Sequence, residues 1–350
     1  MELDLRSINK CVRCGTCRSV CPVFEETGWE SKNTRGRILV MKSLMNGCKP
    51  DADVLDSLNT CTTCGICIDS CPAGVNPVRL VEGARKELVS EGMMTDLQVL
   101  LNEYAIESGN IFGKSQDRLA WLKDKSLLKE KGNCVYFVGC LDSYRYLETA
   151  KKTFRILSRF GATLLQAEQC CGSPLLRTGF DASPLMEANI RQIEDIGADT
   201  IITGCAGCYT TLKNNYPRKF DVKSVPEFLA EHLSELNLRR LDLTVTYHDP
   251  CHLGRMNEVF DQPRQMIKEI CNLKEMRAYG RNARCCGGGG GVRAGYKDLS
   301  LQMAKRRLED VPKGVDYIVT CCPMCIRNLS DAGAGERVVD LVELVEKAMR

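Results

Sequence analysis

Cysteine is the residue that most constrains this chain. Of 350 residues 22 are cysteine, and eighteen of these fall in two arrangements that each occur twice. The first is Cys11-x2-Cys14-x2-Cys17-x3-Cys21-Pro22, repeated as Cys61-x2-Cys64-x2-Cys67-x3-Cys71-Pro72. The second is a single cysteine, an adjacent pair and a CxxC motif: Cys140, Cys170-Cys171 and Cys205-x2-Cys208, then Cys251, Cys285-Cys286 and Cys322-x2-Cys325. Such arrays indicate thiolate ligands of iron–sulfur clusters, and therefore electron transfer or reduction.

Two other uses of so many thiols fit less well. Disulfide scaffolds are typical of small secreted domains, whereas this chain has 350 residues and begins with MELDLRSINK, which lacks the apolar core of a signal peptide. Zinc suits paired CxxC motifs, but it gives no reason for CxxCxxCxxxCP or for adjacent cysteines. We therefore expect an intracellular, cytoplasmic iron–sulfur protein.

The bulk composition argues against some partners. Apolar residues make up 44% of the chain, charged residues 27%, and the formal net charge is +3. The sequence has no block of basic residues of the kind that predicts nucleic-acid binding. It also has no apolar run that approaches the roughly 18 residues of a membrane span. The expectation is a chain without a nucleic-acid partner or a membrane span of its own, which a partner protein could hold at the inner face of a membrane.

The CxxCxxCxxxCP repeat predicts an N-terminal module with two [4Fe-4S] cubane clusters. In this ferredoxin arrangement three closely spaced cysteines hold one cluster, and the fourth reaches the other cluster. The proline after each fourth cysteine stops a helix from continuing back through the ligand. Cluster one is expected on Cys11, Cys14, Cys17 and Cys71, and cluster two on Cys61, Cys64, Cys67 and Cys21.

Apolar periodicity places helices in and after this module. Apolar positions from Arg35 to Leu44, and again after Pro77, recur at helical spacing. We infer a helical ferredoxin-like domain over residues 1–90. A helical connector with a charged, solvated surface is expected over residues 91–132.

From residue 133 onward an α/β pattern occurs twice. Predicted strands at 135–138, 162–165 and 200–203 precede the cysteine groups of the first half, and segments 243–247, 277–279 and 317–320 precede those of the second. Equivalent cysteines lie 111, 115 and 117 residues apart. The spacing indicates a tandem duplication, with repeats at 133–240 and 241–350.

Strands that alternate with helices predict a parallel sheet in each repeat. Loops at the carboxyl ends of parallel strands gather in one crevice, so the five cysteines of each repeat are expected to converge. Five thiolates exceed what a regular cubane needs, which points to an unusual cluster.

Several phrases in the repeats resemble the cysteine-rich domain of heterodisulfide reductases and their relatives. They are Cys170-Cys171-Gly172-Ser173-Pro174 with Arg177-Thr178-Gly179 after it, His248-Asp249-Pro250-Cys251-His252, and Cys285-Cys286 followed by Gly287 to Gly291 and Val292. With the ferredoxin-like part in front, nearly the whole chain resembles the fused catalytic subunit of heterodisulfide reductase. The resemblance implies an α/β fold with an N-terminal α-helical ferredoxin-like module and two tandem α/β CCG repeats with parallel sheets.

The resemblance also implies what the later cysteines hold. In that family each five-cysteine set binds a noncubane four-iron cluster, and the mixed disulfide of coenzymes M and B, part of methanogenesis, is split between two of them. Carried over, the sets are Cys140, Cys170, Cys171, Cys205 and Cys208, and Cys251, Cys285, Cys286, Cys322 and Cys325. Both sets are complete, which favours the disulfide-cleaving type.

The expected activity is reduction of a small-molecule disulfide to two thiols. Electrons would enter through the cubanes from a flavoprotein or a b-type cytochrome subunit of a hetero-oligomeric complex. Two alternatives stay open. One is a non-catalytic iron–sulfur relay subunit of a flavin-linked glycolate, lactate, glycerol-phosphate or succinate dehydrogenase. The other is an enzyme that acts on a different disulfide or persulfide.

The chain has three histidines, and two of them, His248 and His252, flank Cys251. Histidine titrates near neutrality, so either is a candidate proton donor to a departing thiolate. The alternative is that one of them orients the loop by hydrogen bonding. His232 is expected at the surface.

Other residues near the cluster loops have weaker signals. Gly287 to Gly291 lacks the Lys-Ser/Thr pair of a phosphate loop, so these glycines are expected to allow close approach to a cluster or an anionic substrate. Arg177, Arg255 and Arg293 are candidates for pairing with sulfonate or phosphate groups.

Four cysteines fall outside the sets: Cys48, Cys134, Cys271 and Cys321. Cys134 and Cys271 are expected in the core. Cys321 precedes Cys322, but its counterpart in the first repeat is Gly204, so no ligand role is expected for it.

Overall fold

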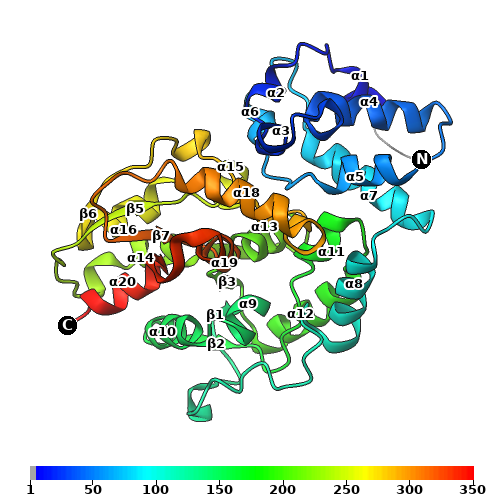
Figure 1. The fold of residues 1–350 in the computed structure, drawn as a ribbon. Coiled ribbons are helices and arrows are strands. Elements are labelled where there is room, and N and C mark those ends of the chain that lie inside the picture. Colours follow the sequence, from blue (N-terminus) through cyan, green and yellow to red (C-terminus); the bar gives the residue numbers. More distant parts are fainter. Residues whose placement is uncertain (1–4) are drawn as a thin grey trace.

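A computed structural model describes residues 5–350, so the first four residues of the predicted N-terminal domain lie outside the described residues. The chain is mixed α/β, with a helical module followed by two α/β units (Figure 1). Within the described residues, no helix combines the length and the apolar character needed to cross a membrane.

The N-terminal module is built from short helices. They are α1 (Leu5–Asn9), α2 (Thr16–Ser19), α3 (Pro22–Thr27), α4 (Thr34–Met45), α5 (Ala52–Asn59), α6 (Ile66–Asp69) and α7 (Pro77–Ser90), with a 3-10 turn η1 at Glu30–Lys32. The predicted helices correspond to α4 and α7, which begin at asparagine caps: the Asn33 side chain accepts from the Gly36 N–H, and that of Asn76 from the Arg79 N–H. Met41, Leu58, Val81 and Ala84 form the centre of its core.

The connector is helical only in its first half. Helix α8 (Asp96–Ser108) starts with a Thr95–Gln98 capping box and ends at the left-handed Gly109. After Gly109, the Asn110 side chain bonds the backbone of Ser108, Phe112 and Lys114, which holds the chain in a turn instead of a helix. Only a 3-10 turn, η2 (Lys125–Leu127), follows before the first sheet.

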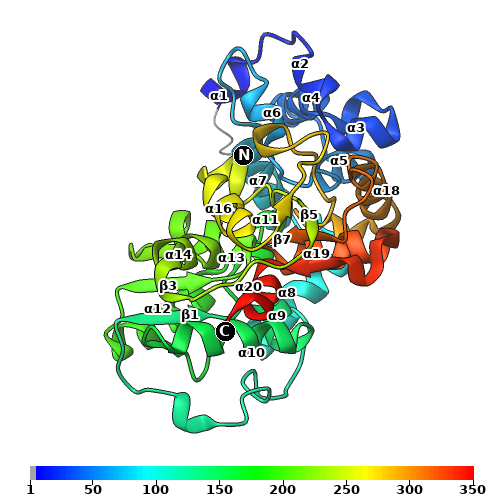
Figure 2. The ribbon, with the colours of Figure 1, turned by 90° about the vertical axis from the view of Figure 1, so that its left-hand side faces the viewer.

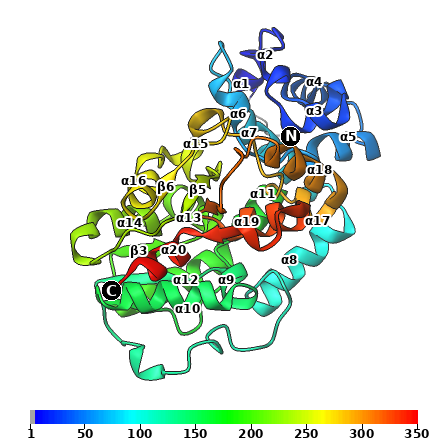
Figure 3. The same cartoon turned by 60° about the vertical axis from the view of Figure 1, so that its left-hand side comes forward.

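The prediction of a solvated connector is also wrong in part. Leu119, Trp121 and Leu122 are buried in the core of the first repeat. Helix α8 packs against one helix of each repeat, α11 (Ser173–Thr178) and α17 (Val292–Gly295). Figure 3 shows α8 running from the helical module along the side of the α/β units. The charged residues of this segment are concentrated at 123–131. The sequence prediction gave weight to these charges and not to the apolar residues that anchor the segment.

The first repeat holds a four-stranded parallel sheet in the order β2-β1-β3-β4. Its strands are β1 (Cys134–Phe137), β2 (Ala162–Leu164), β3 (Thr200–Thr203) and β4 (Asp221–Ser224). Its helices are α9 (Cys140–Tyr144), α10 (Leu147–Ser158), α11 (Ser173–Thr178), α12 (Ser183–Ile196), α13 (Ala206–Asn214) and α14 (Val225–Glu231), with η3 at Leu233–Glu235.

The second repeat has the equivalent sheet, β6-β5-β7-β8. Its strands are β5 (Thr244–Tyr247), β6 (Asn272–Leu273), β7 (Tyr317–Thr320) and β8 (Val338–Asp340). Its helices are α15 (Gly254–Asn257), α16 (Asp261–Ile270), α17 (Val292–Gly295), α18 (Lys297–Leu308), α19 (Pro323–Leu329) and α20 (Leu341–Ala348), with short helical turns η4 (Gly280–Asn282), η5 (Ser330–Ala334) and η6 (Gly335–Arg337).

Two details differ from the sequence prediction. The segment 277–279 is not a strand; the edge strand is β6, which ends at Leu273, so Cys285 is separated from it by a long loop. The edge strands β4 and β8 were missed, because both are short and their pattern is interrupted by the charged Asp221, Lys223 and Asp340.

The two repeats pack with an approximate two-fold relation. Helix α10 of the first repeat packs on α20 of the second, and α14 of the first packs on α16 of the second. By their order in each repeat, α10 corresponds to α16 and α14 corresponds to α20, so the two contacts are equivalent. A contact of this kind is self-complementary, as in a symmetric dimer. Figure 2 shows the second unit lying between the first unit and the N-terminal module. The duplicated sequence therefore folds into two facing halves.

Candidate functional site

The eight N-terminal cysteines gather in two groups. One cavity is lined by Cys11, Cys14, Cys17 and Cys71, and a second by Cys21, Cys61 and Cys64, while Cys67 borders both. These are the two crossed sets expected from the sequence. With Cys67 counted in the second set, each small cavity has the four thiols that a [4Fe-4S] cluster requires, so the residues present fit the group.

The two groups differ in burial. Cys14 is exposed and Cys11 and Cys17 are partly buried, whereas Cys21, Cys64 and Cys67 are buried. Burial raises the pKa of the Cys21 and Cys67 thiols. The first group therefore lies at the surface of the molecule and the second lies inside it.

The ten later cysteines form one continuous series of thiols. In the first repeat the series runs from Cys140 through Cys170, Cys171 and Cys208 to Cys205, each within hydrogen-bonding reach of the next. In the second it runs from Cys251 through Cys285, Cys286 and Cys325 to Cys322. Cys205 and Cys322 join the two halves. The five thiols of each repeat converge, and the two sets meet at the repeat interface.

A cavity of about 360 Å³ lies between the repeats. Nine of the ten thiols line it, and the exception is Cys285. The Cys285 thiol instead lies 3.7 Å from the Thr62 hydroxyl and within hydrogen-bonding reach of Cys64 in the N-terminal module. Cys285 therefore connects the second repeat to the internal group of N-terminal thiols.

Local backbone features place the thiols at the carboxyl ends of the strands. Cys205 and Cys322 are the N-caps of α13 and α19, so Cys208 and Cys325 project from the first turn of each helix. Gly139 is left-handed, and a Cβ there would meet the Cys208 sulfur at 3.1 Å. The chain needs glycine at this position so that Cys140 and Cys208 can approach one cavity wall.

An ion pair that the sequence analysis missed supports Cys140. Arg118, from the connector, donates to Glu168 at 2.9 Å, to the Gly109 carbonyl at 2.8 Å and to the Cys140 sulfur at 3.5 Å. Glu168 also accepts from the Val138 and Gly139 N–H groups. Burial raises the pKa of Glu168 to about 7, while Arg118 and the two N–H groups oppose that shift. No motif marks these residues, because they lie far apart in the sequence and in different predicted domains.

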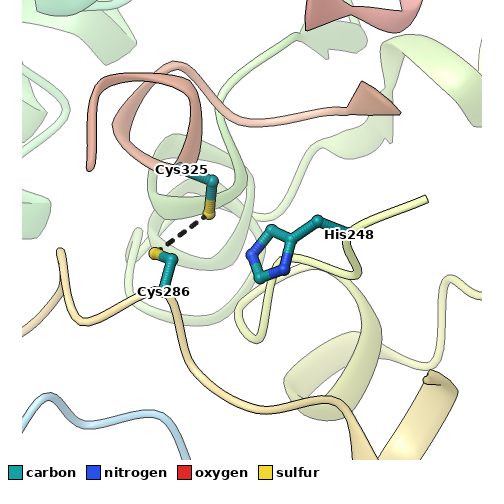
Figure 4. A group of neighbouring side chains, drawn as sticks. All are labelled: His248, Cys286 and Cys325. Atoms are coloured by element: carbon teal, nitrogen blue, oxygen red, sulfur yellow. Dashed lines mark hydrogen bonds between the residues drawn. The ribbon is translucent and has the colours of Figure 1, made fainter. Parts of the chain in front are cut away.

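His248 and His252 are both buried beside the thiols. Arg307 donates to Nδ1 of His248 at 3.0 Å, so Nε2 carries the ring proton, and a ring nitrogen of His248 lies within 4.8 Å of the sulfurs of Cys286 and Cys325 (Figure 4). The Cys286 and Cys325 sulfurs are 3.4 Å apart. Burial, followed by the Arg307 charge, lowers the pKa of His248 to about 3. This ring is a neutral N–H donor beside the second set.

His252 lines the cavity. Its Nε2 donates to the Thr63 carbonyl at 3.2 Å, and its Nδ1 is buried without a hydrogen-bond partner among the described residues. Burial, followed by the Arg177 charge, lowers the pKa of His252 to about 4. His232, in contrast, lies near the surface and pairs with Glu235.

The three candidate arginines have different surroundings. Arg255 does not line the cavity; it donates to the carbonyls of Cys64, Arg281 and Ala283. Arg177 and Arg293 line it but pair with Glu82 and Asp331. The cavity has a third arginine, Arg327, which the sequence analysis missed.

Arg327 has no carboxylate partner among the ion pairs of residues 5–350, and its buried Nε makes no hydrogen bond. Burial lowers the pKa of Arg327, and the nearby cations Arg145 and Arg293 lower it further. The rim of the cavity beside Arg327 is therefore positively charged, and an anionic group would find an unpaired guanidinium there.

The glycine loop makes close contacts. Gly288 to Gly291 line the cavity, and a Cβ on Gly290 would lie 2.4 Å from the Cys61 carbonyl oxygen. The expected close approach is thus made to the N-terminal module. Of the cysteines outside the sets, Cys134, Cys271 and Cys321 are buried and Cys48 is exposed. The thiol of Cys321 lies near the Tyr247 side chain and does not line the cavity.

Comparison with known proteins agrees with this division. The 4Fe-4S dicluster domain family matches residues 7–75, and the cysteine-rich CCG domain family matches residues 134–213 and 245–330. The chain is similar to one subunit of the dihydromethanophenazine:CoB–CoM heterodisulfide reductase, with 36% identity to that of Methanosarcina mazei and 34% to that of Methanosarcina barkeri; 99% of this chain and 95% of each relative are covered. It is also 33% identical to a subunit of the fumarate reductase (CoM/CoB) of Methanothermobacter marburgensis, over 99% of this chain and 73% of that protein.

These relatives extend over nearly the whole chain and include both types of cysteine-rich module. The chain belongs to the heterodisulfide reductase family of iron–sulfur oxidoreductases, among the subunits that join a ferredoxin-type module to two CCG domains.

Proposed function

We propose that this protein reduces a small mixed disulfide to two thiols in the cavity between its CCG repeats. The convergence of nine thiols from two complete sets on one 360 Å³ cavity is the observation that carries the proposal. Two cubanes would be held by the crossed N-terminal sets, and one noncubane four-iron cluster by each five-cysteine set. When bound, these clusters would supply single electrons from both walls of the cavity, and cleavage of an S–S bond consumes two.

The residues of the cavity favour a disulfide with an anionic arm. The cavity walls expose mostly apolar atoms and thiol groups, so water has few hydrogen-bond partners there. Arg327, which has no ion-pair partner among the described residues, leaves a positive charge at the rim. A mixed disulfide such as that of coenzymes M and B, named in the Methanosarcina relatives, has this chemistry. Arg177 and Arg293 are already neutralised by carboxylates and would act by shaping the wall.

Both histidines remain candidates for moving the protons that the two product thiolates require. His252 is the better placed, because it lines the cavity and His248 does not. Among the described residues, Nδ1 of His252 and Nε2 of His248 are both buried without a hydrogen-bond partner. The pKa of about 4 keeps His252 neutral near pH 7 when the cavity holds no added charge. A thiolate formed beside it would favour the protonated ring, so His252 would take up a proton only as negative charge develops. His248 would hold its N–H toward the second set.

The Cys64–Cys285 contact connects the second five-cysteine set to the N-terminal thiols. The exposed thiol group around Cys14 is where a donor protein would reach the chain. The relatives are named as subunits, so we propose that the chain works in the cytoplasm in a hetero-oligomeric complex with a flavoprotein or a b-type cytochrome as electron donor.

Iron content and turnover test the proposal. Two cubanes alone predict about eight irons per chain, and filling both five-cysteine sets predicts about twice that. With reduced viologen as donor, the full chain is expected to reduce a mixed disulfide. Cys286→Ser or Cys322→Ser should abolish turnover and leave the cubane signals intact, whereas Cys48→Ser, outside every set, should change neither. Loss of the cubane signals in Cys286→Ser would show that the ligand sets are assigned wrongly.

The second candidate is an electron-relay subunit of a flavin-linked dehydrogenase or reductase. Similarity to a subunit of the fumarate reductase (CoM/CoB) favours it. A protein with all clusters present that turns over no disulfide, but passes electrons from a flavoprotein, would support this alternative over the first.

A further inference from the structure

Three buried arginines surround the internal group of N-terminal thiols. Arg37, Arg85 and Arg255 are 2%, 1% and 7% exposed. Arg37 lines the cavity of cluster two, Arg85 donates to the carbonyl of Cys61 at 2.7 Å, and Arg255 to the carbonyl of Cys64 at 2.8 Å. The three come from the N-terminal module and the second repeat, and each holds its cation beside the residues that would bind cluster two.

Arg85 has a further structural role. Its guanidinium also donates to the carbonyls of Leu58, Arg177 and Gly290, so one side chain joins the helical module to both repeats. Arg255 similarly bonds Arg281 and Ala283 of its own repeat. The planar five-donor fork of arginine can satisfy several carbonyls at once.

These cations have little carboxylate compensation. Among residues 5–350, Arg37 and Arg85 form no ion pair, and Arg255 reaches Asp69 only at 4.0 Å. Glu82 attracts Arg85 at longer range, but its ion pair is with Arg177. An uncompensated buried charge is costly, even when carbonyls satisfy its hydrogen bonds. A four-thiolate iron–sulfur cluster is itself an anion and gains one more negative charge on reduction. The residues around this cavity thus fit an anion that the protein chain does not supply.

The surroundings of cluster one are different. Arg35, which lines that cavity, pairs with Glu30 at 2.6 Å, and Arg18 lies 3.9 Å from the same carboxylate. Cys14 is exposed, so water also screens charge there. Positive charge at cluster one is therefore partly offset by Glu30 and screened by water, whereas the cations at cluster two are buried.

We propose that Arg37, Arg85 and Arg255 are the counter-charges of cluster two and hold its reduction potential above that of cluster one. Burial alone disfavours the more negative, reduced form, and three unscreened cations offset this. The result would be electron movement inward, from the exposed cluster toward Cys285. This inference rests on the proposed seating of cluster two and is independent of the proposed substrate.

A redox titration of the full chain with its clusters, followed by electron paramagnetic resonance, tests the inference. The signal of cluster two is identified as the cubane signal that Cys64→Ser alters. At fixed solution potential, Arg85→Gln and Arg255→Gln are each expected to lower the ratio of reduced to oxidised cluster two about tenfold, which is ~59 mV for a one-electron couple. Arg85→Lys and Arg255→Lys keep the charge and lose the fork, so they should restore most of that ratio. Arg35→Gln, at the Glu30-paired position, is the matched control and should leave cluster two unchanged.

The glutamine and lysine variants separate charge from structure. Equal shifts in the Gln and Lys variants, or a shift of cluster one as large as that of cluster two, would overturn the inference. If Arg85→Gln does not fold, the Arg255 pair gives the same comparison with fewer lost contacts. Disulfide turnover does not enter this readout, so a failure of the proposed function would leave the titration result standing, and the reverse also holds.

Discussion

Replacing Gly290 with alanine should separate the N-terminal module from the second repeat. Gly290 has φ +61°, and its added Cβ would lie 2.4 Å from the Cys61 carbonyl oxygen and 2.8 Å from the Thr62 carbonyl carbon. Such contacts are essentially never below 3.0 Å, so the loops must move apart by at least 0.6 Å. Both neighbouring atoms are backbone, which cannot turn aside as a flexible side chain could.

The magnitude has two parts that a control variant separates. A left-handed conformation costs a non-glycine residue about 1–2 kcal/mol, and overpacking of a tight contact costs about 1–3 kcal/mol. Gly280 has nearly the same φ, +60°, but nothing within 4 Å of its Cβ position. Gly280→Ala therefore carries the backbone cost alone, and Gly290→Ala carries both.

Anaerobic urea unfolding of the cluster-containing protein measures the difference between the two variants. Gly290→Ala should be less stable than Gly280→Ala by about 1–3 kcal/mol. It should also slow electron transfer from the cubanes to the cavity, because the Gly290 carbonyl accepts from Arg85 and the loop leads from Cys285 and Cys286. Equal losses in the two variants would refute the contact between the glycine loop and the Cys61 loop.

Three further outcomes follow from single side chains. Burial raises the pKa of Asp340 to about 7, above its unfolded value of about 3.9. The folded state therefore binds the extra proton, and the stability that this proton contributes is present below pH ~3.9 and is lost as pH rises to about 7. Asp340→Asn, which still caps α20, should remove this pH dependence from urea midpoints measured between pH 4 and 8. Arg327→Gln should raise the KM for a carboxylate-bearing disulfide about tenfold or more, since a charged hydrogen bond contributes about 1.5–3 kcal/mol, and should leave the KM for the matching amide unchanged. Cys321→Ser should lower thermal stability but keep full iron content, and a loss of iron would make Cys321 a ligand.

The cysteine pattern allowed the grouping of the thiols to be predicted because that grouping depends largely on short spacings that the sequence displays directly. Cys11, Cys14 and Cys17 must lie together whatever the rest of the chain does. The tandem repeat likewise made the sheets predictable, since the strand before Cys140 is an apolar run and the strand before Cys205 consists of β-branched residues. The family resemblance carried the prediction from ligand groups to a fold, and the comparisons confirm the family.

What could not be predicted depends on long-range packing. Arg118 reaches Cys140 only because the connector folds back over the first repeat, and its charged flanking sequence predicted a solvated segment instead. Arg85 bonds carbonyls up to 205 positions away, and no local pattern distinguishes it from a surface arginine. Asp331 forms its ion pair with Arg293 and not with Arg327, a difference that exists only in three dimensions.

The two repeats are related by a two-fold axis, but only approximately, because their contacts with the N-terminal module differ. Both the symmetry and the difference bear on the proposed reaction. Packing of α10 on α20 and of α14 on α16 brings the two five-cysteine sets to a common cavity in equivalent positions. The N-terminal module reaches the second set through Cys285, whose thiol lies beside Cys64 and Thr62 and not in the cavity wall. Cys170, its equivalent, stays in the cavity wall, and its set is supported by Arg118 and Glu168 instead. In the proposed reaction, two equivalent cysteine sets would suit a substrate with two like sulfur atoms, and an asymmetric connection to the N-terminal thiols would impose an order on the two sets. Because both properties come from the same packing, neither repeat could exchange roles with the other without moving the N-terminal module.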